Sequence, residues 1–212
     1  MPVILGTNKA EGILFVYEWP RKLWDFEYVA AIVAIFKDKS TEVLEVYPGK
    51  PFADNRNLLS QVFTDYLFTC PSRQVAQYLF PTQKDTYFYI FDAIMSFDPW
   101  GPNYSFCVDE CCHGEELMYV FNSAESNGYQ FTNKEEQLSR TLTNYWSSFA
   151  QSRGDPNAKH MCEGALFPPV AWPQFDELLN YIQFRQSLTM TVQNLSPETV
   201  NCDFWNSLGY SF

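Results

Sequence analysis

The sequence predicts an α/β domain with a mostly parallel sheet, a helical insertion and an antiparallel hairpin at the C-terminal edge. Residues 3–5 and 86–91 are short apolar runs bounded by turn residues, as expected of buried strands. Between them, residues 13–80 carry apolar side chains at helical spacing. The two strands are therefore joined by a helical crossover and are expected to run parallel. Residues 181–184 and 188–192 predict the hairpin.

The length and composition of the chain limit what it can be. With 212 residues it can form one large domain or two small ones, and 46% hydrophobic with 18% aromatic content indicates a globular protein rather than a disordered one. The formal net charge of −11 argues against nucleic acid or an anionic membrane as a partner, because both are bound by basic patches. Simple solubility is the preferred explanation of the acidity. The longest apolar run, residues 29–36, is too short to span a membrane.

The helical insertion contains two apolar stripes. Both are interpreted as core, or as the wall of a pocket. The first stripe comprises Trp24, Val29, Ile32, Val33 and Phe36, and the second comprises Leu58, Leu59, Val62, Phe63, Tyr66 and Leu67. Pro71 follows the second stripe. Because proline lacks the backbone donor that a helix interior needs, we expect it to break or restart that helix.

The second half of the chain begins with a loop over residues 92–112, which leaves the C-terminal end of the second strand. Residues 117–121 then start a helix. Thr132 and Glu135 form a capping box at the beginning of a longer one. Residues 203–208 predict a closing helix.

Two residues are candidates for proton chemistry. His113, one of only two histidines, lies between two cysteines and a glycine, which places it in a tight turn. Glu11 follows the turn after the first strand. Because parallel strands end at one edge of the sheet, these distant residues can converge there. The residues alone leave two alternatives open: His113 as a structural histidine, and Glu11 as a charge favoured by a helix start.

Five ordered segments resemble the carboxylesterase type B and cholinesterase family, and together they span nearly the whole chain. The first two are Val3-Ile4-Leu5-Gly6-Thr7-Asn8-Lys9-Ala10-Glu11-Gly12 and Cys112-His113-Gly114-Glu115-Glu116-Leu117-Met118-Tyr119-Val120-Phe121. The others are Thr64-Asp65-Tyr66-Leu67-Phe68-Thr69-Cys70-Pro71, then Tyr145-Trp146 through Gly154-Asp155-Pro156-Asn157 to Trp172-Pro173, and Cys202-Asp203-Phe204-Trp205.

The resemblance implies a carboxylic ester hydrolase with a Ser-Glu-His triad on an α/β-hydrolase fold. It assigns Glu11 as the acid and His113 as the base. Glu116 matches a position buried behind the catalytic residues, although a helix-start charge explains it equally well. The Gly-x-Ser-x-Gly turn that would carry the nucleophile is absent, because no two of the nine glycines are four positions apart.

The oxyanion loop His-Gly-Gly-Gly is absent as well. We therefore expect residues 1–212 to be the C-terminal portion of a single carboxylesterase type B domain whose N-terminal remainder acts as its partner. Such a chain is expected to be inactive alone on small-molecule esters. The alternative is a non-catalytic cholinesterase-like module for adhesion or protein contact, since the family includes such members. A binding module, however, has no need of both Glu11 and His113.

Six cysteines allow fifteen pairings, and sequence alone does not choose among them. The resemblance implies two disulfides, Cys70–Cys202 and Cys107–Cys112. It leaves Cys111 and Cys162 either bonded to each other or free. Sequons begin at Asn103 and Asn194, and with the disulfides they favour secretion or the lumen of the secretory pathway. No signal peptide is visible at the start of the sequence.

No cofactor, metal-ligand spacing or phosphate loop is predicted. A zinc site built from Cys107, Cys111, Cys112 and His113 is conceivable, but the residues are crowded and we disfavour it. The second histidine, His160, lies in a polar loop and is interpreted as solvated.

Overall fold

The computed structural model describes residues 1–18, 21–158, 170–185, 191–194 and 201–210. Its centre is a sheet of four strands, β1 (Val3–Asn8), β2 (Thr86–Asp92), β3 (Asn180–Arg185) and β4 (Thr191–Asn194), in the order β1-β2-β3-β4. The first three strands are parallel and β4 is antiparallel to β3. The predicted α/β fold, with its mostly parallel sheet and its edge hairpin, is confirmed.

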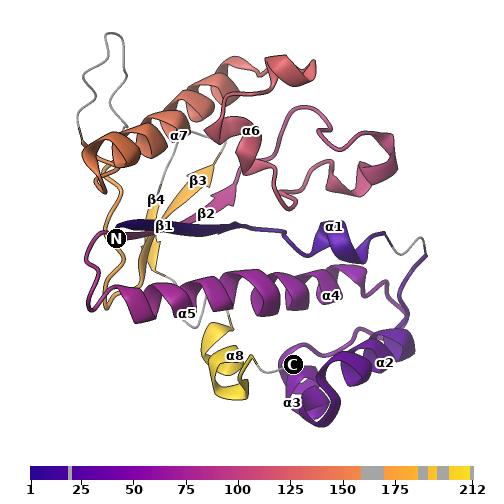
Figure 1. The fold of residues 1–212 in the computed structure, drawn as a ribbon. Coiled ribbons are helices and arrows are strands. Elements are labelled where there is room, and N and C mark those ends of the chain that lie inside the picture. The colour runs from indigo at the N-terminus through magenta and orange to yellow at the C-terminus, as the bar shows by residue number, and fades with distance from the viewer. Residues whose placement is uncertain (19–20, 159–169, 186–190, 195–200, 211–212) are drawn as a thin grey trace.

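Helices cover both faces of the sheet (Figure 1). The crossover from β1 to β2 contains α1 (Ile13–Val16), α2 (Asp25–Phe36), α3 (Ser40–Val46), α4 (Arg56–Phe63) and α5 (Cys70–Leu79). The crossover from β2 to β3 contains α6 (Glu116–Val120) and α7 (Asn133–Ser152). The predicted capping box of α7 is present, with Thr132 accepting from the Glu135 amide and Glu135 accepting from the Thr132 amide.

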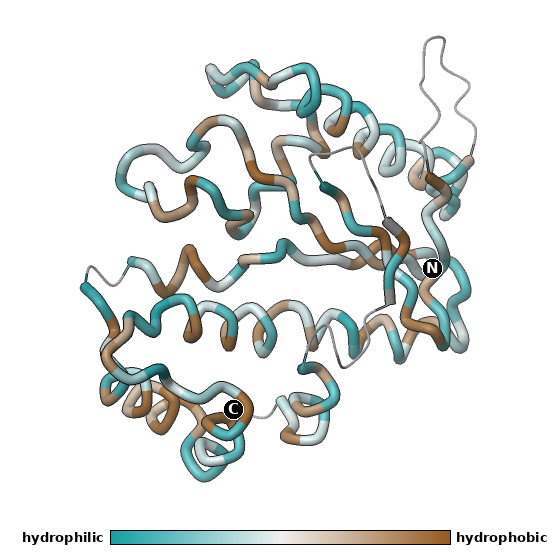
Figure 2. Tube along the Cα trace, turned by 180° about the vertical axis from the view of Figure 1, so that it is seen from behind, coloured by the Kyte–Doolittle hydropathy of each residue, from teal (hydrophilic) through white to brown (hydrophobic). Residues whose placement is uncertain are grey.

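Strand β2 separates two cores because its side chains alternate between the faces. Tyr87 and Phe91 pack with Leu138 and Trp172 beneath α7, whereas Phe88 and Ile90 belong to a second cluster with Ala76 of α5. In Figure 2, hydrophobic segments lie on the central strands and also along the helices of the insertion. Both faces of the sheet are therefore apolar, as expected for parallel strands buried between helices.

Pro71 lies in the first turn of a new α-helix, so the predicted restart is confirmed, although the backbone stays helical across the junction. A π-helical turn, Thr64–Thr69, links α4 to α5, and the backbone of Thr64, Thr69 and Cys70 stays helical throughout. Pro71 lies at the start of α5, directly after the wide turn. Single π-turns shift the hydrogen-bond pattern of a helix, which lets the chain pass a residue that lacks an N–H.

The closing helix α8 (Cys202–Leu208) packs on the helical insertion and is tied to α5 by the Cys70–Cys202 disulfide, whose Cα atoms are 4.9 Å apart. The second implied disulfide, Cys107–Cys112, is also present. Cys111 is free and buried. Cys162, His160 and the Asn194 sequon's Leu195 and Ser196 lie outside the described residues. No described helix has the length and apolar character that crossing a membrane requires.

A buried polar chain joins the helical insertion to α8. The Tyr47 hydroxyl donates to Asp65 Oδ2 at 2.6 Å and accepts from the Trp205 indole N–H at 3.0 Å. Burial raises the pKa of Asp65 from its ordinary 3.8 to about 6, although the hydrogen bond from Tyr47 opposes the change. The folded state therefore holds the proton of Asp65 more tightly than the unfolded state does.

We predict that Asp65 lowers stability as pH rises. Its contribution is fully present below pH 3.8 and is lost as pH passes about 6, because only the unfolded chain ionises readily in that window. The gap between the two pKa values corresponds to about 3 kcal/mol. Denaturant unfolding at pH 4 and pH 7 gives the free energy of unfolding at each pH. From the lower to the higher pH, that of Asp65→Asn should rise by about 2–3 kcal/mol relative to that of the unaltered chain. The exposed Asp38→Asn is the matched control, and parallel pH dependences for all three proteins would disprove the assignment.

Candidate active site

Glu11 lies in the turn that follows β1 and is buried. One carboxylate oxygen, Oε1, accepts a hydrogen bond from the Asn8 amide at 2.6 Å. The next residue, Gly12, donates its amide to Thr64 Oγ1 at 2.9 Å. A Cβ at Gly12 would lie 2.1 Å from the Ser60 carbonyl oxygen, so only glycine lets this turn pack directly on α4.

His113 is carried by the loop that follows β2. Two backbone hydrogen bonds join this loop to the end of β1, from Lys9 to the Phe91 carbonyl at 2.9 Å and from Ala10 to the Cys111 carbonyl at 3.1 Å. Immediately after the histidine, Gly114 has φ +81°, a left-handed conformation that favours glycine. The loop therefore reverses sharply and enters α6 just beyond His113.

The structure brings Glu11 and His113 together. His113 Nδ1 lies 2.5 Å from Glu11 Oε2, across 102 positions of sequence. The side chain of Glu11 is 7% exposed and that of His113 is 44% exposed, so one partner is fixed in the interior while the other faces outward. In the part of the chain that the structure describes, no hydrogen bond reaches the other ring nitrogen, Nε2. That nitrogen is free to exchange a proton with a bound molecule.

The environment of Glu11 balances opposing effects on its ionisation. Burial raises the pKa of the Glu11 carboxyl, and the nearby charge of Glu116 acts in the same direction. The hydrogen bonds from Asn8 and His113 lower the pKa, because both favour the ionised form. An imidazole held by a buried carboxylate has a fixed tautomer and orientation, which is what general-base chemistry requires.

Asn8 connects the strand end to both sides of His113. Its side-chain amide donates to the Cys112 carbonyl and to Glu116 Oε2, each at 2.7 Å. Glu116 is thus the first residue of α6 and also a hydrogen-bond partner of the buried strand end, so both interpretations of it describe part of its environment. The sequence prediction missed Asn8. Its place after the first apolar run predicts only a turn residue, although a buried amide at a strand end is suited to bridging two loops.

Two aromatic rings flank the imidazole. The ring centroids of Phe15 and Phe68 lie 5.4 Å and 5.2 Å from that of His113. Phe15 belongs to α1 and Phe68 to the π-helical turn, so the helical insertion supplies the apolar surface beside the histidine. No pattern in the sequence distinguishes these two phenylalanines from the others in the insertion.

The larger cavities lie beside the Glu11–His113 pair rather than on it. One of about 640 Å³ is lined by Phe15, Phe26 and Phe63 with other residues of the helical insertion. Another of about 480 Å³ lies between α4 and the sheet and is lined by Asn8 and Asp65 among others. Neither is lined by Glu11 or His113. Proton transfer depends on the direct contact of the two side chains rather than on the volume of a neighbouring cavity.

The disfavoured zinc set does not form in this structure. Cys107 and Cys112 are bonded to each other, and His113 Nδ1 is occupied by Glu11. Cys111 points elsewhere, with its thiol donating to the Phe91 carbonyl at 3.1 Å. Burial raises the pKa of that thiol well above its ordinary value, so Cys111 is an inert, structural cysteine.

Comparison with known proteins agrees with the resemblance. The sequence pattern of the carboxylesterase family matches residues 1–205. The chain is 33% identical to the cAMP-regulated D2 protein of Dictyostelium discoideum over 85% of its own length, and 31% identical to the Crystal protein of the same organism over 100%. It is 34% identical to the human Cocaine esterase over 58%. It covers 32%, 38% and 20% of these relatives, respectively.

The chain thus spans about a third of the length of the Dictyostelium relatives, and it shares the family's pattern almost from end to end. Its mostly parallel sheet covered by helices on both faces is the architecture expected of that pattern. The chain belongs to the carboxylesterase family.

Proposed function

We propose that this chain supplies the acid and the base of a serine carboxylic ester hydrolase. The observation that carries the proposal is the contact of 2.5 Å between the buried Glu11 carboxylate and the half-exposed His113 imidazole. In the proposed reaction, His113 Nε2 takes the proton of a serine as it attacks the ester carbonyl, and later returns a proton to the leaving alcohol. Glu11 holds the imidazole in the required tautomer and stabilises the imidazolium.

The surroundings of the pair suit this role. Asn8 and Glu116 support the loop from behind, through the amide that binds both Glu116 and the Cys112 carbonyl. Phe15 and Phe68 provide an apolar wall for the acyl or alcohol group of a small ester. An adhesion or interaction module could share this fold, but it would gain nothing from a carboxylate placed against a histidine.

The nucleophile and the oxyanion donors must come from polypeptide outside these 212 residues, and we propose that residues 1–212 form the C-terminal portion of one hydrolase domain. Three observations support this. The chain spans about a third of its relatives' length, and it lacks Gly-x-Ser-x-Gly. Among the described strands, β1 also has a partner on one side only, which leaves its other edge available for a further strand.

We further propose an oxidising location, secreted or in the secretory lumen. Two disulfides in the described part of the chain support it. Asn103 and Ser105 of the first sequon are both exposed, so that glycosylation there meets no steric obstacle.

The first prediction from this proposal concerns the chain alone. Purified residues 1–212 should hydrolyse a small aryl ester no faster than a protein background and should not react with a serine-directed phosphonate. A histidine and a carboxylate without a nucleophile can give at most about 10²–10⁴-fold general-base assistance to water, far below a complete esterase. Turnover abolished by His113→Ala, or stoichiometric labelling of any serine, would contradict the prediction.

The second prediction concerns the complete site. The chain is extended upstream by its own coding sequence or by the corresponding region of a Dictyostelium relative, so that it contains Gly-x-Ser-x-Gly. This protein should react with one serine-directed phosphonate per chain and should hydrolyse the small aryl ester catalytically. Within it, Glu11→Gln should lower kcat by roughly 10³–10⁴-fold while labelling slows in parallel, because the imidazole loses its fixed tautomer. Glu45→Gln, an exposed carboxylate on α3, is the matched control and should leave kcat unchanged. Equal activity of the Glu11 and Glu45 variants would exclude Glu11 as the acid.

A further inference from the structure

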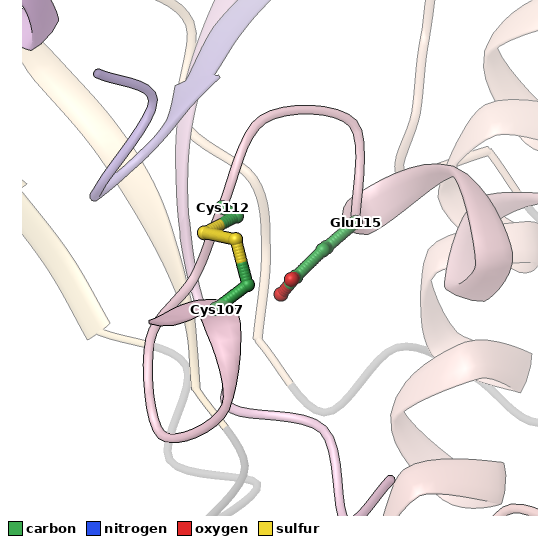
Figure 3. A group of neighbouring side chains, drawn as sticks. All are labelled: Cys107, Cys112 and Glu115. Atoms are coloured by element: carbon green, nitrogen blue, oxygen red, sulfur yellow. A yellow bond between two sulfur atoms is a disulfide. The ribbon is translucent and has the colours of Figure 1, made fainter. Parts of the chain in front are cut away.

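The corner beside His113 holds a cluster that ester hydrolysis does not use. Figure 3 shows the Glu115 side chain extending from the loop before α6, with its carboxylate directed at the Cys107–Cys112 disulfide. One carboxylate oxygen and the two sulfur atoms all lie within 4.8 Å of one another. Each of the three residues is at most 3% exposed. Two sulfurs and a carboxylate at such distances form a set of ligand atoms.

Glu115 is the unexplained member of this cluster. Both of its carboxylate oxygens are buried, and no hydrogen bond of good geometry reaches either of them. The Cys112 amide and the Trp100 indole interact weakly with the carboxyl group, and Asp98 and Glu116 lie near enough to repel its charge. Native proteins rarely bury a carboxyl group without a partner, because the desolvation is costly. A carboxylate in this position is suited to a positive ligand that it meets in another state of the protein.

We propose that reduction of the Cys107–Cys112 disulfide creates a binding site for a thiophilic divalent cation of the Zn²⁺ class, with Cys107 Sγ, Cys112 Sγ and one Glu115 oxygen as ligands. A dithiol reductant supplies two electrons and two protons, breaks the S–S bond and is itself oxidised to a disulfide. Binding of the cation then releases the protons of both thiols, and that of Glu115 where it is present. The resulting site has two thiolates and one carboxylate.

The dimensions of the cluster suit such a cation. Zinc binds thiolate sulfur at about 2.3 Å and carboxylate oxygen at about 2.0–2.2 Å in tetrahedral geometry, so its ligand atoms lie within about 4 Å of one another. Three atoms already within 4.8 Å reach that geometry through small side-chain rotations once the S–S bond is open. A cavity of about 260 Å³ is lined by Trp100, Gly114 and Glu115 among others, so a space large enough for water lies beside the residue that supplies the oxygen ligand.

The charge of the surroundings also favours a cation. Two thiolates and a carboxylate carry three negative charges next to Asp98 and Glu116, and a divalent ion offsets most of that repulsion. This set differs from the crowded zinc set disfavoured above, because it contains neither Cys111 nor His113. The thiol of Cys111 donates to the Phe91 carbonyl, and His113 contacts Glu11. The catalytic pair and the metal ligands therefore do not compete.

The proposal is tested with Co²⁺ as a spectroscopic probe, which shows thiolate charge-transfer bands and intense visible bands when it is bound in tetrahedral geometry. The 212-residue chain is reduced anaerobically with a dithiol, freed of reductant and titrated with Co²⁺, and Zn²⁺ is then added to displace the cobalt. We expect one Co²⁺ per reduced chain with two thiolate ligands, and no such bands in the oxidised chain. Glu115→Gln should weaken Co²⁺ binding by at least about 10–100-fold. That is the loss of metal affinity seen when a residue that only supports a ligand is removed, and Glu115 is proposed as a ligand itself.

Two matched variants separate this site from its neighbours. Cys111→Ser removes an adjacent thiol and should bind Co²⁺ as the unaltered chain does. Glu116→Gln removes one neighbouring charge but no ligand, so it should weaken binding less than Glu115→Gln does. Cys107→His opens the disulfide without reductant. It should bind Co²⁺ with a single thiolate band, and a second change, Glu115→Gln, should weaken that binding.

The proposal is overturned if the reduced chain shows no thiolate–Co²⁺ absorption while its circular dichroism shows that it remains folded. It is also overturned if the Cys107→Ser/Cys112→Ser variant binds Co²⁺ equally well. If reduction unfolds the chain, absence of Co²⁺ binding by Cys107→His overturns it instead. None of these readouts depends on ester hydrolysis.

Discussion

The parallel pairing of β1 with β2 is the constraint on which the candidate site depends. In this register Asn8 lies opposite Phe91, so the two strands end at the same edge of the sheet. The loops that leave them begin side by side, and backbone hydrogen bonds from Lys9 and Ala10 extend the pairing into those loops. A shift of β1 by one residue would turn Asn8 to the opposite face and move Glu11 away from His113. The geometry of the Glu11–His113 pair thus follows from strand register.

Hydrogen bonds among buried polar groups then fix the positions of the side chains that strand pairing brings close together. Glu11, Asn8 and Glu116 are linked within a few ångströms, and each buried oxygen or nitrogen of Glu11 and Asn8 that faces the loops has a specific partner. The exception is Asn8 Oδ1, which has none. Such networks carry a desolvation cost that only good geometry offsets, so loss of one member destabilises the remainder. The site is rigid on its interior side and open on the side where His113 Nε2 faces outward.

Sequence patterns predict the parts of this structure that are local or repeated in the family. Apolar runs predict β1 and β2 because buried strands need them, and the family segments place Glu11, His113 and both disulfides. The contacts made by Asn8 and the burial of Glu115 were not predicted, since both depend on which loops meet in three dimensions. The first apolar stripe shows the same limit. Ile32 and Phe36 are buried, but Val33 is 47% exposed, because α2 has apolar residues on more than one face and periodicity does not tell which face is covered.

The loop between residues 107 and 112 connects the two proposals. The Cys112 carbonyl accepts from Asn8, and His113 follows directly, so whatever closes the loop at Cys112 also helps to hold the histidine against Glu11. In the oxidised protein the closure is a covalent bond to Cys107. A cation bound by Cys107, Cys112 and Glu115 would join the same two ends of the loop and add a tie to the start of α6 on the far side of His113. The burial of the Glu115 carboxylate then has a structural reason, because the group lies where a second closure of the same loop would need a ligand.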